Sequence, residues 1–273
     1  MVINNDQNRD VRHIMNLKKK KYRDEKEAFF MEGLRAVEEA LLSNVNIDKI
    51  VVSDSFMNTE FFKKISELYS STYKNNVELV LLVVNEHIFS LISETETPQG
   101  IGAVLPIPHY RQEQVIKPNC NYLLLENLQD PGNMGTIIRT ADAAGFDGVL
   151  CTKGCVDVYN SKVLRSTVGS IFHIPVVKCG SVEGLAPSLK SMGLKLYAAH
   201  ITAGSTCFEQ EFSKGSVVLI GNEANGLTKD ALDRADCLVS IPMPGKAESL
   251  NASIAAAILM YEVVRKSSPP VIK

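Results

Sequence analysis

The sequence predicts an α/β protein, because short apolar runs alternate with helical patterns along nearly the whole chain. Apolar runs such as Tyr122–Glu126 and Val217–Ile220 have the length of buried parallel strands, and amphipathic segments separate them. A polar stretch punctuated by prolines, between Pro106 and Pro118, divides the chain in two. With 273 residues, of which 45% are apolar, two packed domains are expected.

The first part, residues 1–108, is predicted to be a small α/β domain. It begins with a helix and a basic turn, and helical spacing follows Gly33. Strand-like segments are Ala28–Glu32, Lys49–Ser53, the apolar run Val77–Val84 and Gly100–Leu105, and further helices are expected at Leu34–Leu41, around Thr59–Tyr73 and after Asn85.

After a linker at 109–118, residues 119–273 are predicted to form a parallel sheet with helices on both faces. A helix over Gly135–Ala144 ends at Gly145, and a long helix covers Ala252–Val264. The strand-like runs are Tyr122–Glu126, Gly148–Cys151, Ile174–Val177, Lys195–Ala199, Val217–Ile220 and Leu238–Ile241. In such sheets, ligands bind beyond the carboxyl ends of the strands.

Composition excludes several classes of protein. No apolar run approaches the ~20 residues of a membrane-spanning helix, and the polar start lacks the pattern of a signal peptide, so a cytoplasmic protein without a membrane partner is expected. The six cysteines form no C-x-x-C pair and lie near no histidine at zinc-site spacing, so we expect reduced thiols and no metal site. Cys151 and Cys155 are the one closely spaced pair.

Basic residues crowd the first segment, although the net charge of the chain is −2. This pattern indicates a polyanionic partner at one face, and the alternative is a solvated helix end whose lysines contact nothing in particular. The basic residues are Arg9, Arg12, Lys18, Lys19, Lys20, Lys21, Arg23 and Lys26.

The most informative segment runs from Asn127 to Gly145, where a turn-forming loop opens directly into an amphipathic helix. The loop Asp130–Asn133 has the composition of a tight turn. Arg139 is expected near this loop, where a phosphate would meet both a permanent cation and the N–H groups of a helix N-terminus. The alternative is a surface or structural ion-pair role for Arg139.

Two further polar loops follow strand-like runs. In Leu219–Leu227, Glu223 stands at a strand tip, where it can accept hydrogen bonds from an arginine, from a ligand or from backbone N–H groups at a helix start. In Ile241–Ser253, prolines and a glycine expose backbone groups that can grip a flat heterocycle, and more polar residues gather than one helix cap requires. Three such loops predict a shared pocket.

Other nucleotide-binding and hydrolytic sites lack support. The chain has no mononucleotide P-loop, and the spacing of Gly132 and Gly135 lacks the first glycine of the dinucleotide fingerprint. The five histidines are scattered singly and Gly-x-Ser-x-Gly is absent, which argues against a hydrolytic triad.

These motifs resemble the SpoU (TrmH-like) family of RNA ribose 2′-O-methyltransferases, part of the SPOUT superfamily. Three segments carry the resemblance in order: N-L-Q-D-P-G-N-M-G-T-I-I-R-T-A-D-A-A-G, L-I-G-N-E-A-N-G-L and I-P-M-P-G-K-A-E-S-L-N-A-S-I-A-A-A-I. It extends through Asp157–Gly169. Residues 1–108, with Lys20–Arg23, Phe30–Gly33 and Thr97–Gly100, are similar to the family's N-terminal RNA-substrate-binding domain.

The resemblance implies a fold and a reaction. The implied fold is a trefoil-knotted, parallel-sheet SPOUT methyltransferase domain preceded by a small, ribosomal-protein-like α/β RNA-binding domain, and the implied assembly is a homodimer. Such knots are rare exceptions to the rule against threading. The implied reaction is methyl transfer from S-adenosylmethionine to a ribose 2′-hydroxyl of RNA.

Site residues follow from the family motifs, position by position. The implied catalytic residues are Asn133, Arg139, Glu223, Ser249 and Asn251. The implied cofactor-binding residues, acting largely through their backbone, are Ala199, Ile220, Gly221, Ile241, Met243, Leu250 and Asn251. The implied RNA-binding residues are Arg12, Lys19, Lys20, Lys21, Arg23, Lys162 and Arg165. No metal is implied, and Ser161 stands where many relatives have proline.

In-line displacement at a sulfonium methyl mainly demands alignment and a dry pocket. Because an arginine stays protonated in proteins, we expect Arg139 to clamp the neighbouring phosphate and to stabilise the developing alkoxide, while a phosphate oxygen or a water takes the proton. Glu223 would orient the arginine or the dimer interface. Asn133, with the polar residues of the third loop, would position the ribose and the loops.

Ribosomal RNA is preferred over transfer RNA as the substrate, because the separate N-terminal domain resembles that of enzymes that modify ribosomal RNA. An antibiotic-resistance methylase has a similar architecture, and folded RNA is recognised by shape that no short motif records. Two competing functions are a noncatalytic RNA-binding protein of the same fold, which the intact motifs disfavour, and a nucleotide-binding oxidoreductase or transferase, which the missing dinucleotide fingerprint disfavours.

Overall fold

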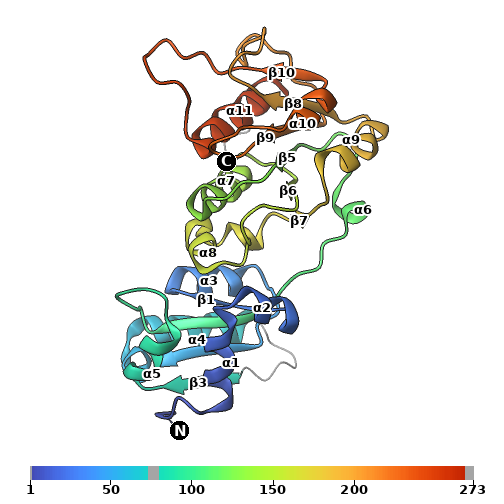
Figure 1. The fold of residues 1–273 in the computed structure, drawn as a ribbon. Coiled ribbons are helices and arrows are strands. Elements are labelled where there is room, and N and C mark those ends of the chain that lie inside the picture. The colour runs from blue at the N-terminus through green and yellow to red at the C-terminus, as the bar shows by residue number, and fades with distance from the viewer. Residues whose placement is uncertain (1, 73–79, 268–273) are drawn as a thin grey trace. The chain divides into compact units, whose positions relative to one another are not determined.

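The computed structural model describes residues 2–72 and 80–267, which form two compact units (Figure 1). Unit 1 comprises Met1–His109 and Tyr159–Phe172, and unit 2 comprises Tyr110–Val158 and His173–Lys273. The segment Tyr159–Phe172 therefore differs from the predicted division, which placed it in the second domain. It packs in unit 1 because helix α8 (Ser161–Thr167) lies against strand β1 (Ala28–Glu32) and the rings of Tyr159 and Phe29 are 4.8 Å apart.

Unit 1 contains a four-stranded sheet in the order β1-β4-β2-β3. Strand β4 (Ile101–Pro106) runs antiparallel to both of its neighbours, and β2 (Lys49–Ser53) pairs in parallel with β3 (Val80–Val84). The predicted run at 77–84 is a strand from Val80, and its residues 77–79 lie outside the described part. The helices of unit 1 are α1 (Arg9–Leu17), α2 (Lys20–Lys26), α3 (Leu34–Leu42), the 3₁₀ turn η1 (Phe56–Asn58), α4 (Glu60–Thr72), α5 (Glu86–Ile92), α8 and the 3₁₀ turn η2 (Ser170–Phe172).

One face of this sheet packs against α1 and α5, whose buried residues recur every three or four positions. The motifs around Gly33 and Gly100 meet at the end of the sheet. The side-chain oxygen of Gln99 accepts the Leu34 N–H at 2.8 Å, and so caps α3. Gly100 has φ +77°, and a Cβ there would lie 2.5 Å from the Ser53 hydroxyl, so only glycine fits. These two sequence motifs are therefore explained by packing.

Unit 2 contains a six-stranded parallel sheet in the order β10-β8-β9-β5-β6-β7, which confirms the predicted parallel α/β fold. Its strands are β5 (Tyr122–Leu125), β6 (Gly148–Cys151), β7 (Val176–Lys178), β8 (Lys195–Ala199), β9 (Ser216–Ile220) and β10 (Cys237–Val239). Its helices are α6 (Gln112–Val115), α7 (Pro131–Ala143), α9 (Val182–Ser191), α10 (Lys229–Arg234) and α11 (Ala252–Ser267).

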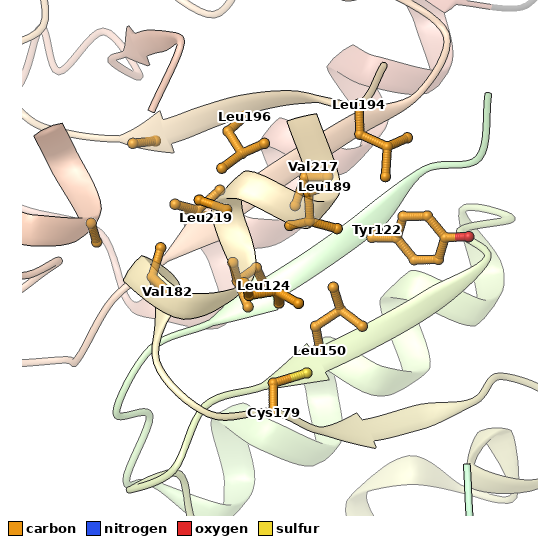
Figure 2. Close-up of a cluster of buried hydrophobic side chains, with 14 of the residues drawn as sticks. Tyr122, Leu124, Leu150, Cys179, Val182, Leu189, Leu194, Leu196, Val217 and Leu219 are labelled. Carbon is orange, nitrogen blue, oxygen red and sulfur yellow. The ribbon is translucent and has the colours of Figure 1, made fainter. Parts of the chain in front are cut away.

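Helices cover both faces of this sheet, as the sequence predicts. Figure 2 shows one face, where Leu124, Leu150 and Leu219 of the strands pack with Val182 and Leu189 of α9. The residues that alternate with these along the strands point to the opposite face, where α7 and α11 pack on each other and on β6 and β9. The residues of β5, β6 and β9 are buried on both faces, which is why these runs read as continuously apolar.

Several element boundaries differ from the sequence prediction. Helix α7 begins at Pro131, four residues earlier than expected, because Asp130 caps it and proline suits the first helical position. Within the predicted linker, α6 forms a short helix, and the hydroxyl of Tyr122 donates to the Val115 carbonyl at 2.9 Å. The last strand ends at Val239 rather than at residue 241.

The six cysteines are free thiols, three of them buried and three partly exposed. Within residues 2–72 and 80–267, no helix is long and apolar enough to cross a membrane. No group of three or more histidine, cysteine or acidic side chains in the same residues could hold a metal ion.

Candidate functional site

The parallel sheet of unit 2 brings the three marked loops to one edge. The loops follow β5, β9 and β10, which all point the same way, so each begins at the carboxyl end of its strand. The isolated bridge between Thr206 and Ser240 and the hydrogen bond from the Glu126 N–H to the Ile220 carbonyl, 2.9 Å, continue the pairing past the strand ends. This edge is the predicted ligand-binding side.

A chain of polar side chains joins all three loops. The Asn133 amide nitrogen donates to Glu223 at 3.1 Å, and the Asn133 carbonyl oxygen accepts from the Asn251 amide nitrogen at 2.9 Å. Asn133 belongs to α7, Glu223 follows β9, and Asn251 precedes α11. Three residues predicted from separate sequence motifs are therefore in direct contact.

The direction of every hydrogen bond in this chain is fixed. An ionised Glu223 only accepts, so the amide nitrogen of Asn133 must face it and the Asn133 oxygen must face Asn251. Asn251 then donates through its nitrogen, which leaves its oxygen for the N–H groups of Ser253 (2.8 Å) and Ile254 (3.4 Å). This polarity assigns both amide orientations without ambiguity.

Glu223 holds the loop that precedes α7. Its carboxylate accepts the backbone N–H groups of Gln129 at 3.1 Å and Asp130 at 2.9 Å. Burial would raise the pKa of Glu223, but the hydrogen bonds from the Asp130 backbone, the Asn133 amide and the Gln129 backbone outweigh it, and the pKa is lowered. The carboxylate thus anchors a helix start, which is one of the roles expected from its position at a strand tip.

Asn251 caps the N-terminus of α11, and Asp130 caps that of α7. The Asp130 carboxylate accepts the Asn133 N–H at 2.7 Å. The Asn251 oxygen accepts from both the backbone N–H and the hydroxyl of Ser253, the latter at 2.6 Å. The two helix starts are therefore tied to each other through capping residues.

Arg139 lies outside this polar chain. It is an exposed residue of α7, and within the described residues its guanidinium makes no hydrogen bond or ion pair. Glu223 makes no contact with Arg139 among the described residues, so its role in orienting the arginine or the dimer interface stays a prediction. Ser249 is likewise exposed and has no hydrogen bond to any described residue. Both side chains are available to a ligand.

The second loop is a tight backbone turn after β9. A Cβ on Gly221 would lie 2.1 Å from the Gly226 carbonyl carbon and 2.3 Å from the Leu227 nitrogen, so the site admits no side chain. The amide of Asn222 donates to the Asn127 carbonyl at 2.9 Å, which binds this turn to the first loop. Gly221 thus allows two stretches of backbone to approach closely.

The third loop presents free backbone. Between Ile241 and Leu250, no N–H or C=O makes a hydrogen bond to any described residue, and the loop side chains are mostly exposed or half-buried. The unpaired N–H and C=O groups of such a segment can form hydrogen bonds with a heterocyclic ligand.

The predicted cofactor-binding residues lie at the ends of neighbouring strands. Ile220 and Gly221 are buried where β9 ends, and Ala199 is half-buried where β8 ends. Ile241 and Met243 follow β10 and are half-buried, and Leu250 and Asn251 precede α11. All seven residues therefore come from the carboxyl edge of three adjacent strands and the loops after them.

Sequence reasoning missed a pair of positioning residues in this region, Glu126 and Thr228. Glu126, which is buried, ends the run that starts as β5 and accepts the Thr228 N–H at 2.8 Å and the Thr228 hydroxyl at 2.9 Å. The sequence pattern predicts only that Glu126 is the last residue of a strand. A charged residue closing an otherwise apolar run is the signal that marks it, because a buried carboxylate needs partners.

In unit 1, most of the predicted RNA-binding cations reach the surface. Arg12 and Lys19 are exposed, as are Lys21 and Lys20, although Lys20 forms an ion pair with Asp24 at 2.6 Å. Lys162 and Arg165 are exposed on α8, in the same unit. These six residues keep the charge that a polyanion would need.

Arg23 requires a correction. It was predicted to bind RNA, but its side chain is only 5% exposed, and its guanidinium donates to the carbonyls of Leu17 at 2.8 Å and Lys18 at 2.9 Å. Those carbonyls belong to the end of α1, where intrahelical donors are missing. Arg23 thus closes the α1–α2 corner, which the position of an arginine in a basic run does not reveal.

Comparison with family models gives two matches. Residues 121–261 match the model of the SpoU rRNA Methylase family, and residues 8–103 match the MRM3-like substrate binding domain. The first match contains all three loops of the edge described above, and the second contains strands β1, β2 and β3 of unit 1 and the beginning of β4.

The chain is also similar to individual proteins. It is 37% identical over 256 residues to the 23S rRNA (guanosine(2553)-2′-O)-methyltransferase RlmP of Bacillus subtilis, and the match covers 94% of this chain and 96% of the relative. An AdoMet-bound rRNA methyltransferase from Sinorhizobium meliloti is 30% identical, with a TM-score of 0.85 and 97% of each chain covered. AviRb, a SpoU methyltransferase from Streptomyces viridochromogenes solved with AdoMet, is 25% identical, with a TM-score of 0.85 and coverage of 95% of this chain and 98% of AviRb.

Proposed function

The chain belongs to the SpoU rRNA Methylase family, and from that membership we propose that it transfers a methyl group from S-adenosylmethionine to a ribose 2′-hydroxyl of ribosomal RNA. One observation carries the proposal: Asn133, Glu223 and Asn251, from three separate motifs, form one hydrogen-bonded chain, and neither the Arg139 side chain nor the backbone of residues 241–250 has a hydrogen-bond partner among the described residues. A noncatalytic RNA-binding protein of the same fold is disfavoured because Asn133, Arg139, Glu223 and Asn251 are all present.

The cofactor, when bound, supplies a sulfonium methyl group that is electrophilic without further activation. The chain's own contribution is to hold it and to exclude water. Backbone groups at Gly221, Ile241 and Leu250 would hold the cofactor, with Ala199, Ile220, Met243 and Asn251 beside them. The free N–H and C=O groups of the third loop support this assignment, as does the direct link from Asn251 to Asn133.

Arg139 would act on the RNA. It is a permanent cation without a protein partner in the described residues, on the helix whose start Glu223 and Asn133 hold in place. Such a cation can clamp a phosphate and stabilise the negative charge that develops on the 2′-oxygen. It cannot serve as a base at ordinary pH, so the proton passes to a phosphate oxygen or to water. Ser249, exposed in the third loop, would position the ribose.

Residues 1–108 would bind the RNA, and residues 119–273 would carry out the reaction. The exposed cations Arg12, Lys19 and Lys21, with Lys162 and Arg165 of α8, support an RNA surface on unit 1. Ribosomal RNA is favoured over transfer RNA because the Bacillus subtilis relative is named for a guanosine of 23S rRNA and covers nearly the whole chain. That RNA is the first substrate to test.

We further propose a homodimer with a trefoil knot in unit 2, working in the cytoplasm. Helix α11 supports the dimer, because Ile254 and Tyr261 are 50% and 52% exposed. They are seven residues apart and so lie on one face of the helix. Light scattering of the purified protein tests the dimer, with a charge placed at Ile254 as the disrupting variant and a charge at the exposed Thr136 as the matched control.

The reaction is tested with tritiated S-adenosylmethionine and separate pools of unmodified 23S ribosomal RNA and transfer RNA. Nuclease digestion then identifies the labelled nucleoside. We expect label in a 2′-O-methyl nucleoside from the ribosomal pool alone, and its loss in Arg139→Ala. Cofactor affinity of Arg139→Ala, measured by calorimetry, should stay within about twofold of the wild type, because the residue contacts RNA only.

Label in the transfer RNA pool would mean that the substrate is transfer RNA and not ribosomal RNA. No label in either pool, despite cofactor binding, would favour the noncatalytic RNA-binding alternative. A large loss of cofactor affinity in Arg139→Ala would contradict the role given to the arginine.

A further inference from the structure

Lys153 and Lys246 are exposed at the carboxyl edge of the sheet in unit 2, the edge that carries the candidate site. Lys153 lies in the turn after β6, and Lys246 lies in the third loop, after β10. In the sheet, β8, β9 and β5 stand between these two strands, so the first and second loops begin between them. Neither ammonium group has a hydrogen bond or an ion pair with any described residue.

Most acidic side chains of the same edge are bonded to the protein. Glu223 and Asp130 accept hydrogen bonds from backbone N–H groups. The buried Glu126 accepts the backbone N–H and the hydroxyl of Thr228. Glu248 of the third loop is the exception, because it is exposed and its carboxylate has no hydrogen bond or ion pair with a described residue. The two lysines are therefore available to a negatively charged ligand, whereas three of these four carboxylates are already occupied.

Lysines near the amino edge of the same sheet differ in this respect. Lys190 of α9 forms an ion pair at 2.8 Å with Asp236, which precedes β10. The ammonium group of Lys195 lies 5.5 Å from the centre of the Tyr197 ring. Lys214, two residues before β9, is exposed and has no ion pair or hydrogen bond with a described residue. Lys214 thus provides a matched control, with the same charge at the opposite edge.

The turn that presents Lys153 is fixed by its backbone. The Lys153 N–H donates to the Gly180 carbonyl at 3.1 Å. The Asn127 N–H donates to the hydroxyl of the preceding residue, Thr152, at 3.2 Å. Gly154 has φ +112°, and a Cβ there would lie 2.3 Å from the Asn127 side-chain oxygen, so only glycine fits directly after the lysine. Lys153 is therefore held beside the first loop, while its side chain stays exposed.

RNA that reacts at this edge must also run along it. A phosphate flanks each ribose on either side, so the strand brings negative charge to the surface next to the reacting 2′-hydroxyl. A lysine binds a phosphate as a point charge, so it needs an exposed side chain and no fixed array of partners. Lys153 and Lys246 meet this requirement on two sides of the candidate site.

We infer that Lys153 and Lys246 bind phosphate groups of the RNA, so that the carboxyl edge of unit 2 is itself part of the RNA-binding surface. The inference rests on the proposed function, because the proposed reaction identifies the polyanion as RNA. It adds contacts beside the candidate site to the exposed cations of unit 1. Each phosphate contact releases counterions from the RNA, so each makes binding more sensitive to salt.

Filter binding of unmodified 23S ribosomal RNA, without cofactor and at several salt concentrations, tests the contacts. Lys153→Ala and Lys246→Ala should each reduce the slope of log affinity against log salt by about one, and the double variant by about two. Between about 50 and 200 mM salt, affinity should therefore fall about threefold less in each single variant than in the wild type. Lys214→Ala should keep the wild-type slope. Lys153→Arg should keep it too, because the charge is retained.

Two further measurements separate phosphate binding from a structural role. In methyl transfer, KM for RNA should rise in step with the loss of RNA affinity, while kcat stays within about twofold, because the contact is the same in the ground state and the transition state. Cofactor affinity, measured by calorimetry, and the melting temperature should not change, because the side chains of Lys153 and Lys246 contact no described partner.

Three results would overturn the inference. Wild-type slopes in Lys153→Ala and Lys246→Ala would mean that these lysines contact no phosphate. An equal reduction in Lys214→Ala would mean that only the total charge matters. A large loss of cofactor affinity in Lys153→Ala would mean that the lysine supports the first loop instead. Wild-type protein that binds the RNA but transfers no methyl group would contradict the proposed reaction alone, because the slopes are measured without cofactor.

Discussion

Asn251 makes two separable contributions that substitution can resolve. Its oxygen caps α11 by accepting N–H groups of Ser253 and Ile254, and its nitrogen donates to the Asn133 oxygen at 2.9 Å. Asn251→Ala removes both contributions. Asn251→Asp keeps an acceptor for the helix cap but removes the donor to Asn133. The pair of variants therefore isolates the cross-link between α11 and α7 from the cap.

The expected magnitudes follow from the contacts. Loss of the cap costs about 1 kcal/mol, and loss of the hydrogen bond to the buried Asn133 costs about 1 kcal/mol more. In Asn251→Ala, the free energy of local opening at the start of α11 should therefore be about 2 kcal/mol lower than in the wild type. This corresponds to about a 30-fold increase in the opening equilibrium constant. Asn251→Asp should keep the cap and lose the remaining ~1 kcal/mol, because the aspartate oxygen faces the Asn133 oxygen.

Hydrogen exchange measures this effect locally, which a two-unit chain requires, since global unfolding need not be two-state. The amides of Ser253, Ile254 and the following turn report the opening of α11. Amides in β5 serve as an internal reference, because the strand lies in the middle of the sheet. Asn133→Ala, combined with each variant, completes a double-mutant cycle with an expected coupling of about 1 kcal/mol.

Two results would refute this reasoning. Equal exchange rates in Asn251→Asp and Asn251→Ala would mean that the cap contributes nothing. A coupling energy near zero in the cycle with Asn133 would mean that the contact between the two amides is not maintained in solution.

Three further predictions concern packing, pH and RNA binding. Gly221→Ala should lower the free energy of unfolding of unit 2 by about 3 kcal/mol, because the added Cβ would lie 2.1 Å from the Gly226 backbone. Gly204→Ala is the control and should leave the free energy of unfolding unchanged, because the space around Gly204 is open. Urea unfolding of both variants measures the difference. The lowered pKa of Glu223 means that folding favours its ionised form. Its contribution to the free energy of unfolding is therefore complete above the ordinary pKa of 4.5 and is lost as the pH falls below that value. Urea midpoints measured at descending pH should fall less in Glu223→Gln than in the wild type. Arg23→Ala should lower the melting temperature of unit 1, because it removes the hydrogen bonds to the Leu17 and Lys18 carbonyls. Lys21→Ala should leave the melting temperature unchanged, because Lys21 is exposed. It should instead reduce the salt dependence of RNA binding, which filter binding at several salt concentrations would show.

The features that periodicity and loop position control were predictable from the sequence. The parallel sheet follows from apolar runs that are buried on both faces, and the shared edge follows from parallel strands that end in marked loops. Once these two are known, Asn133, Glu223 and Asn251 must lie at one edge. Their grouping required no knowledge of distances.

The features that depend on single side-chain contacts were not predictable. The start of α7 at Pro131 depends on whether Asp130 turns its carboxylate to the Asn133 N–H, and the same Asp-Pro-Gly-Asn sequence forms a tight turn when it does not. Arg23 sits among exposed cations, and only the free carbonyls at the end of α1 explain its burial. The packing of Tyr159–Phe172 against β1 depends on contacts between residues far apart in sequence.

The polarity of the amide chain explains why its residue types are not interchangeable. A carboxylate at position 223 fixes the orientation of Asn133, which fixes that of Asn251, and the last acceptor in the chain is the one that caps α11. Replacement of Asn133 by aspartate would set its acceptor against Glu223, and replacement of Asn251 by aspartate would set an acceptor against Asn133. Glutamine at position 223 would offer an extra donor to groups that already donate. Each substitution leaves one mismatched pair, and each displaces the start of α7, on which Arg139 depends for its position two turns further along the helix.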